Sequence, residues 1–396
     1  MITRELVSKY FHAGLIGPHF DESLEIEECI EGVLSNSRRY LVDTQYINAA
    51  QQVYERGQDH SGLSKTNSFN PNSNKDVAAR IESLHAGLTI PKTSKGNISI
   101  TKDWLELHCE KNSFINSVLE WRNANRKLQA ISQMGKYISH EAGHNWLSTT
   151  WRSYAENGSG RMVSEACAIS NIPMDLRGAF IAPEGFQWVS MDIRHMDLFI
   201  LAELSHDGAL LRDLNAEDPL VSIGARLGGI ADQQTVKVFL NAFLYEFTTE
   251  VEIGSILGFT SLDFLQVAYP DLYNYLDSKI HEVINTKILH LGWKSRSRNF
   301  EWDPVSISGP HSNLKQKVLA SVCQQNMALA FKIIMAESVK SEPSLRDTCW
   351  IPGHSELAVL CPVACLSDVA ERFVSISRGL TQAKPSVLTG RCWTFL

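Results

Sequence analysis

The chain has 396 residues, of which 44% are hydrophobic and 20% charged, and its formal net charge at pH 7 is −7. This length is sufficient for two or three subdomains around a sizeable core, and the composition is that of an ordinary soluble globular protein. No apolar run reaches the roughly 18 residues that span a bilayer, and the first residues do not form a signal peptide. We therefore expect an intracellular protein without a membrane partner. The acidic balance does not predict a nucleic-acid binder, but phosphate contacts depend on local basic patches and the class is not excluded.

Eight cysteines are scattered along the chain, and the closest pair, Cys361 and Cys365, has Pro362 between its members. There is no CxxC pair. We therefore expect reduced, mostly buried thiols rather than disulfides or a zinc site.

The first third of the chain is predicted to be mostly helical. Residues 1–60 are helical in character, residues 61–76 form a polar, turn-rich linker, and a helix is expected at 77–84. A long helical region follows at about 103–137 and contains three basic residues close together: Arg122, Arg126 and Lys127. They form either a solvated helix face or a contact to nucleic-acid phosphates.

Residues 140–144 match the zinc-protease pattern HExxH, with His140, Glu141 and His144 as the candidate residues. That chemistry needs one uninterrupted helix, so that both imidazoles share a face and the glutamate reaches a metal-bound water. Gly143 lies inside the pattern and no obvious third ligand follows it. We do not expect a zinc site here.

The centre of the chain carries the main candidate metal ligand. Residues 186–191 read as a short buried strand that ends at Asp192, and apolar residues from Met196 onward recur at helical spacing. A carboxylate at a strand end is suited to a divalent cation. On this segment alone, a helix N-cap is the commoner role for such an aspartate, and other motifs must decide.

The most periodic helix is predicted at 232–248, after a glycine-punctuated helical segment at 206–232. One of its faces is apolar, and a separate polar stripe repeats every four residues: Gln233, Lys237, Asn241 and Tyr245. Such a stripe either meets a phosphate and a base or is ordinary surface.

The last part of the chain is predicted to contain a long helix and a pair of strands. In order, the sequence predicts a helical and then basic segment at 260–310 that contains Arg296, a helix at 313–340 that carries Gln324 and Lys332, strands at 348–352 and 356–363, a helix at 366–379, and a strand that ends at Trp393.

Short motifs occur in a common order along most of the chain. They are 69–73 (similar to FNxNS), 91–99 with 120–122 (KTxxGxxS…EYR), 160–164 (TGRLSS), 171–173 (QNIP), 177–185 (RxAFxAPEG) and 201–207 (LAHLSHD). Together they resemble the motifs of family A DNA polymerases, closest to the theta and nu branch. The pattern at 140–144 then falls between thumb and palm, where the family has no metal. No 3′–5′ exonuclease domain precedes the thumb, so proofreading is not expected.

The resemblance implies an α/β fold shaped like a right hand, with an antiparallel palm sheet, helical fingers and a helical thumb. We expect N-terminal helices and the thumb at 1–160, the palm at 161–205 and 312–396, and the fingers at 206–311. The implied partners are primer–template DNA and a deoxynucleoside triphosphate. The implied DNA contacts are Arg161, Gln324, Lys332, His354 and Arg296.

In this family, two palm aspartates hold two Mg²⁺ ions for phosphoryl transfer. Asp192 matches the first aspartate, but the turn that should read His-Asp-Glu reads His354-Ser355-Glu356. A neutral hydroxyl cannot replace a bridging carboxylate. Glu356 is the remaining candidate metal ligand, although we expect its side chain to point to the other face of the hairpin. The resemblance therefore implies a weakened Mg²⁺ site.

Several residues that bind the incoming nucleotide in this family are also replaced. Lys237 and Tyr245 match the triphosphate lysine and the template-side tyrosine of the family. Four positions depart from its pattern. Gln233 replaces an arginine and Asn241 replaces a stacking aromatic residue. Leu220 replaces a histidine, and Asp197 replaces the glutamate that discriminates against ribose.

Because these losses gather in one pocket, the first hypothesis is a family A fold that binds primer–template DNA but has lost most or all nucleotidyl transfer. The second is an active DNA polymerase with an altered metal site at Asp192 and Glu356. The third is a protein-interaction module. If the source is eukaryotic, the resemblance suggests a nuclear role in DNA repair or replication, with repair proteins such as a helicase as partners.

Overall fold

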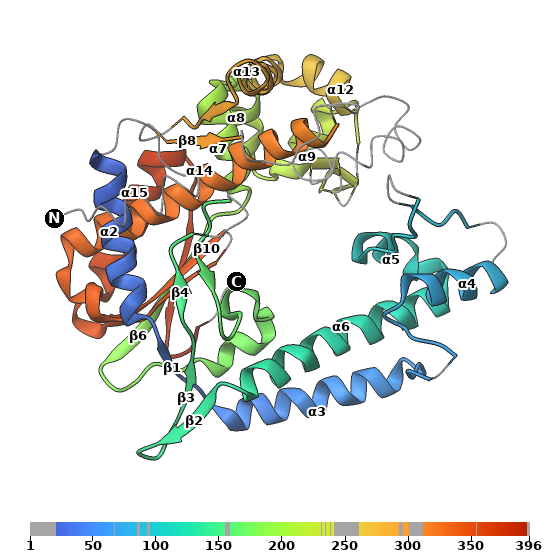
Figure 1. Ribbon diagram of the computed structural model, residues 1–396, viewed down its shortest axis with the longest axis horizontal. Coiled ribbons are helices and arrows are strands. Elements are labelled where there is room, and N and C mark those ends of the chain that lie inside the picture. The colour runs from blue at the N-terminus through green and yellow to red at the C-terminus, as the bar shows by residue number, and fades with distance from the viewer. Residues whose placement is uncertain are drawn as a thin grey trace. The chain divides into compact units, whose positions relative to one another are not determined.

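A computed structural model gives the fold (Figure 1). It describes residues 21–66, 68–84, 88–92, 96–154, 159–230, 232–233, 235–237, 239–240, 261–292, 296–300, 312–353 and 355–393. The chain forms two compact units: unit 1 comprises Met1–Tyr40, Ser148–Asn171 and Ile181–Leu396, and unit 2 comprises Leu41–Leu147 and Ile172–Phe180. The range 1–160, predicted to hold the N-terminal helices and the thumb, contains residues of both units. The division into thumb, palm and fingers stays a prediction.

Unit 1 is organised around an antiparallel four-stranded sheet of order β11-β6-β10-β9. Its strands are β6 (Phe186–Asp192), β9 (Trp350–Pro352), β10 (Glu356–Pro362) and β11 (Ser386–Gly390). The central strands β6 and β10 are buried over most of their length, which explains why most of their residues are apolar. The predicted antiparallel sheet is confirmed, and so is the strand that ends at residue 192.

Helices pack on this sheet and on each other (Figure 1). α15 (Leu366–Thr381) contacts β6, β10 and β11, whereas α2 (Asp21–Asn36) and α7 (Met196–Ser205) contact the long helix α14 (Ser312–Ser341). By length and composition α14 could cross a membrane, but 89% of its most apolar window is buried inside the protein. It is therefore the central core helix of unit 1.

The other elements of unit 1 surround α14 and the sheet. They are β4 (Trp151–Arg152), β5 (Val163–Ser164), η2 (Ile169–Asn171), α8 (Gly208–Leu214), α9 (Pro219–Arg226), α12 (Ser261–Ala268), α13 (Pro270–Thr286), β7 (Ile288–His290), β8 (Ser297–Asn299), η5 (Pro343–Asp347) and η6 (Val363–Cys365). In the helix predicted at 232–248, the described residues from 233 to 240 are helical, and Val236, Phe239 and Leu240 are buried. All eight cysteines are free thiols, as predicted, but only three of them are buried and the other five are partly exposed, so the expectation of mostly buried thiols is wrong.

Gly224 in α9 is a point of close packing. A Cβ at this position would lie 2.3 Å from the carbonyl oxygen of Ile230 and 2.8 Å from Cγ2 of Val236. We expect Gly224→Ala to lower the free energy of unfolding by about 1–3 kcal/mol, because a backbone atom cannot move aside as a side chain can. Urea unfolding measures this change. Gly379→Ala in α15 is the control, since a Cβ there meets nothing within 4 Å. Equal stability of the two variants would contradict the prediction.

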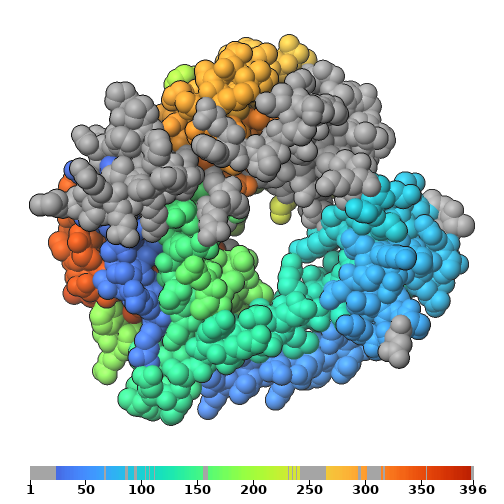
Figure 2. Space-filling model, viewed as in Figure 1, coloured from blue at the N-terminus to red at the C-terminus, as the bar shows by residue number. Residues whose placement is uncertain are grey.

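Unit 2 is mostly helical. Its helices are α3 (Thr44–His60), α4 (Asn74–Leu84), α5 (Lys102–His108), η1 (Cys109–Lys111), α6 (Ser113–Gly135) and η3 (Met174–Ala179). It also contains β2 (Ile138–Glu141) and all of β3 (His144–Ser148) but the last residue, while β1 (Arg39–Leu41), of which only Leu41 lies in unit 2, completes a sheet of order β1-β3-β2. Figure 2 shows the surface of α3 and α4 in blue. The helix predicted at 103–137 is interrupted at Asn112, whose side chain accepts a hydrogen bond from the Ile115 amide at 3.1 Å and so caps α6.

Arg122 and Lys127 have internal partners within unit 2. Arg122 donates to two backbone carbonyls at 2.7 and 2.9 Å and to Oδ1 of Asn74 at 3.1 Å. Lys127 forms an ion pair with Asp175 at 2.6 Å. Arg122 therefore belongs neither to a solvated face nor to a phosphate-binding surface, since its donors already hold the loops around α6 in place.

The HExxH pattern lies on a β-hairpin rather than on a helix. Ala142 and Gly143 connect β2 to β3 with φ values of 50° and 79°, as in a two-residue hairpin turn. Glu141 pairs with His144 across the hairpin, so the two histidines do not share a helix face. The geometry that a zinc protease needs is not formed here.

Candidate active site

Asp192 is the last residue of β6 and is half-buried. It does not cap a helix. α7 begins at Met196, and the N-cap position is taken by His195, which has a left-handed backbone (φ 54°) and makes no capping bond with its side chain. The N-cap alternative is therefore wrong, and the carboxylate lies at the end of a central strand.

Ser355 lies beside Asp192. Its hydroxyl donates to Oδ1 of Asp192 in a long hydrogen bond of 3.4 Å, and its carbonyl oxygen accepts from the Ile193 amide at 3.1 Å. The turn between β9 and β10 thus brings residue 355 to the strand end, as the motif predicted. In place of a second carboxylate it supplies a neutral hydroxyl.

Glu356 differs from its expected orientation. In the register of β6 and β10 it is the direct partner of Asp192, and directly opposed residues in an antiparallel pair share one face of the sheet. Its side chain lies over Gly353: a Cβ at that position would be 2.2 Å from Cγ and 2.8 Å from Oε1 of Glu356. Gly353 is therefore required for this conformation.

The donors near the strand end are thus two carboxylates and one hydroxyl. Among the residues that the structure describes, no group of three or more His, Cys, Asp or Glu side chains could hold a metal ion. Magnesium is often bound through one or two carboxylates together with substrate phosphates. The strand end offers one carboxylate from Asp192 and one from Glu356, whose side chain lies over Gly353, and it does not supply the paired aspartates that bridge two ions.

The charged residues after β6 surround His195, which no sequence pattern singled out. Burial lowers the pKa of His195 below its ordinary value; Asp197 and Asp218 oppose this shift, whereas Arg194 and Lys237 add to it. Asp197 and Lys237, two of the predicted pocket residues, therefore both lie close enough to His195 to act on its charge. The lowered pKa favours a neutral imidazole at pH 7.

The Gln233 side chain is hydrogen-bonded to Asp218, the N-cap residue of α9. Its amide nitrogen donates to Oδ2 of Asp218 at 2.6 Å, while Oδ1 of Asp218 accepts from the first amides of α9. The side chain that replaces the triphosphate-binding arginine is therefore neutral and already has an acceptor. Asn241, Tyr245 and His354 lie outside the described residues.

Two of the predicted DNA contacts lie near each other in unit 1. Arg161 and Gln324 are both half-buried. The preceding Gly160 packs on α14, since a Cβ there would lie 3.6 Å from Cγ of Gln325. The loop that carries Arg161 thus lies beside the part of α14 that carries Gln324.

Arg296 and Lys332 are placed differently from the prediction. Lys332 is fully buried, and Arg296 is 2% exposed. Both contact the buried carboxylate of Glu27, with Nζ of Lys332 at 2.7 and 2.8 Å from its two oxygens. Residues with this burial cannot contact DNA phosphates, so the prediction is wrong for both. They form an internal ion triad in which Glu27 comes from α2, Lys332 from α14 and Arg296 from the position just before β8.

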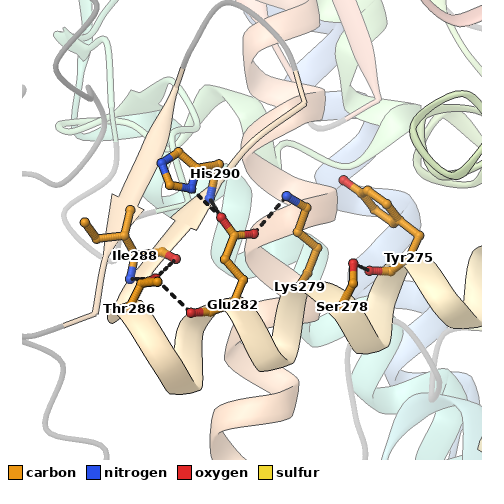
Figure 3. A network of polar contacts seen from close by, with 7 residues as sticks. All are labelled: Tyr275, Ser278, Lys279, Glu282, Thr286, Ile288 and His290. Atoms are coloured by element: carbon orange, nitrogen blue, oxygen red, sulfur yellow. Dashed lines mark hydrogen bonds and ion pairs between the residues drawn. The ribbon is translucent and has the colours of Figure 1, made fainter.

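A second polar network holds β7 against α13 (Figure 3). The Glu282 carboxylate accepts from Nζ of Lys279 at 2.9 Å and from the His290 amide at 3.2 Å, and it also contacts the His290 ring. Burial raises the pKa of Glu282, but these contacts outweigh it and hold the pKa below its ordinary value. The network stabilises the hairpin and involves none of the predicted site residues.

Comparisons with known proteins agree with this architecture. The family model described as DNA polymerase family A matches residues 41–236. The thermostable DNA polymerase I of Thermus aquaticus is 32% identical over 153 residues, which are 36% of this chain and 18% of that protein. The solved structure of the POL domain of Pol1 from M. smegmatis, in complex with DNA primer-template and dNTP, has a TM-score of 0.71 at 17% identity, covering 94% of this chain and 70% of that one. Sequence motifs, sheet topology and these similarities together show that the chain belongs to DNA polymerase family A.

Proposed function

We propose that this protein binds primer–template DNA and has lost most or all nucleotidyl transfer. The observation that carries the proposal is the position of Ser355, whose hydroxyl is hydrogen-bonded to Asp192 where the family needs a second metal-binding carboxylate. A two-metal mechanism needs charged oxygen donors for both ions. Gln233 adds to the argument, because its amide is bound to Asp218 and carries no charge for a triphosphate.

The register of Asp192 with Glu356 favours a second candidate, an active polymerase with an altered site. These two carboxylates would hold a single Mg²⁺, which would supply neutralisation of the triphosphate charge. In this chain Lys237 would bind the triphosphate, and Asp197 would discriminate against the ribose. A role in DNA repair or replication stays a prediction from the resemblance.

Single-nucleotide incorporation on a labelled primer–template, with magnesium and then manganese, tests the proposal. Wild type should incorporate no faster than Asp192→Ala, while fluorescence anisotropy should show DNA binding that falls steeply between two salt concentrations. Incorporation that disappears in Asp192→Ala would support the second candidate instead. Undetectable or salt-insensitive DNA binding would contradict both and leave the protein-interaction module.

A further inference from the structure

A polar pocket of about 410 Å³ lies in unit 1 between the C-terminal end of α14, the beginning of η5 and α15. Ser338 and Ser341 contribute from α14, and Asp368 and Arg372 from α15. None of its lining residues belongs to the candidate active site. Its volume is within the range of ordinary ligand pockets.

Ser338, one of the residues that line this pocket, has a hydroxyl without a hydrogen-bond partner. The residue is 1% exposed, and its Oγ forms no hydrogen bond with the part of the chain that the structure describes. An unsatisfied buried hydroxyl is unfavourable. A ligand with N–H donors that enters the pocket would provide the missing partner.

The charge of the pocket selects a cation. The pocket is lined by three carboxylates and one guanidinium, from Glu342, Asp368, Glu371 and Arg372. Among the described residues, neither Asp368 nor Glu371 forms an ion pair. The last carbonyl groups of α14 add a negative partial charge and the first amides of α15 a positive one, so the excess of carboxylates decides the charge of the pocket.

We propose that this pocket binds an arginine side chain presented by a basic segment of a partner protein. A guanidinium has five N–H donors in a planar fork, so one group can reach two carboxylates and a hydroxyl together. An ammonium is a point charge with three donors and matches this arrangement less well. The exposed Asp368 and Glu371 attract the basic segment, and the buried Ser338 accepts from its guanidinium.

The test is fluorescence anisotropy of a labelled hexa-arginine peptide with the full chain at ~0.15 M salt. We expect Asp368→Asn/Glu371→Gln to weaken binding about tenfold and Ser338→Ala to weaken it measurably. The control Asp59→Asn/Glu82→Gln removes the same charge from exposed positions in unit 2 and should change binding less than about twofold.

Two further probes separate arginine docking from other cation binding. A labelled hexa-lysine peptide should bind more weakly than hexa-arginine, and free spermidine should compete only weakly. Equal losses in the two double variants would overturn the proposal, because the acidic chain would then attract the peptide without using the pocket. Spermidine binding as tight as that of the peptide would also overturn it in favour of a free polyamine.

Discussion

Glu27→Gln is expected to lower the free energy of unfolding by about 3–5 kcal/mol, because it leaves Arg296 and Lys332 buried without the carboxylate that they share. Glu27 and Lys332 are fully buried, so water cannot replace this interaction. Urea unfolding followed by tryptophan fluorescence measures the change. Stability within about 1 kcal/mol of wild type would show that the triad is not a buried charge cluster.

Lys332→Met is the matched control for this experiment. Glu27 keeps its contact with Arg296, and the remaining pair is neutral, so the cost should be below about 1.5 kcal/mol. A loss equal to that of Glu27→Gln would contradict this account of the charges.

The same control predicts a pH effect. Burial, opposed by Glu27 and reinforced by Arg296, lowers the pKa of Lys332 to about 8 from an ordinary value of 10.5. Between these values the unfolded chain binds more protons than the folded protein, so the contribution of Lys332 to stability increases as pH rises from about 8 to 10.5. Lys332→Met should remove this increase, as unfolding at pH 7 and 9.5 would show.

Ser355→Asp alone is expected to leave single-nucleotide incorporation within about tenfold of the wild-type rate. It restores a carboxylate beside Asp192, but Gln233 and Leu220 still supply no charged or imidazole ligand for the triphosphate. Since one electrostatic contact to the transition state is typically worth about 10²–10³ in rate, the triple variant Ser355→Asp/Gln233→Arg/Leu220→His should exceed the single variant at least about 100-fold.

Adding Asp192→Ala to the triple variant is the control, and it should return incorporation to background because the strand-end carboxylate is lost. Robust extension by Ser355→Asp alone would contradict the proposal that several defects act together. A triple variant no faster than the single one would show that these three positions do not limit the reaction.

The local elements around the site were predictable because burial leaves a periodic pattern in the sequence. The apolar run of β6, the strand pair β9–β10 and the long helix α14 were all found this way. The sequence also predicted that Ser355 would lie beside Asp192, since the motif resemblance identified both strands. Whether Asp192 caps a helix could not be decided from its neighbours, because that depends on the residue at which α7 begins.

By itself, the sequence determined the family resemblance, the order of the elements and the residues that replace the expected ligands. Tertiary structure alone decided which way the charged side chains face. Lys332 is 305 residues from Glu27 in the chain, and no periodicity connects α14 with α2 across that separation. A lysine in a mostly apolar helix segment such as 327–335 indicates a buried partner, but the partner is identified only when the two helices pack. A buried cation is stable only beside a buried anion, so the packing of α2 on α14 turns a predicted DNA contact into part of the core.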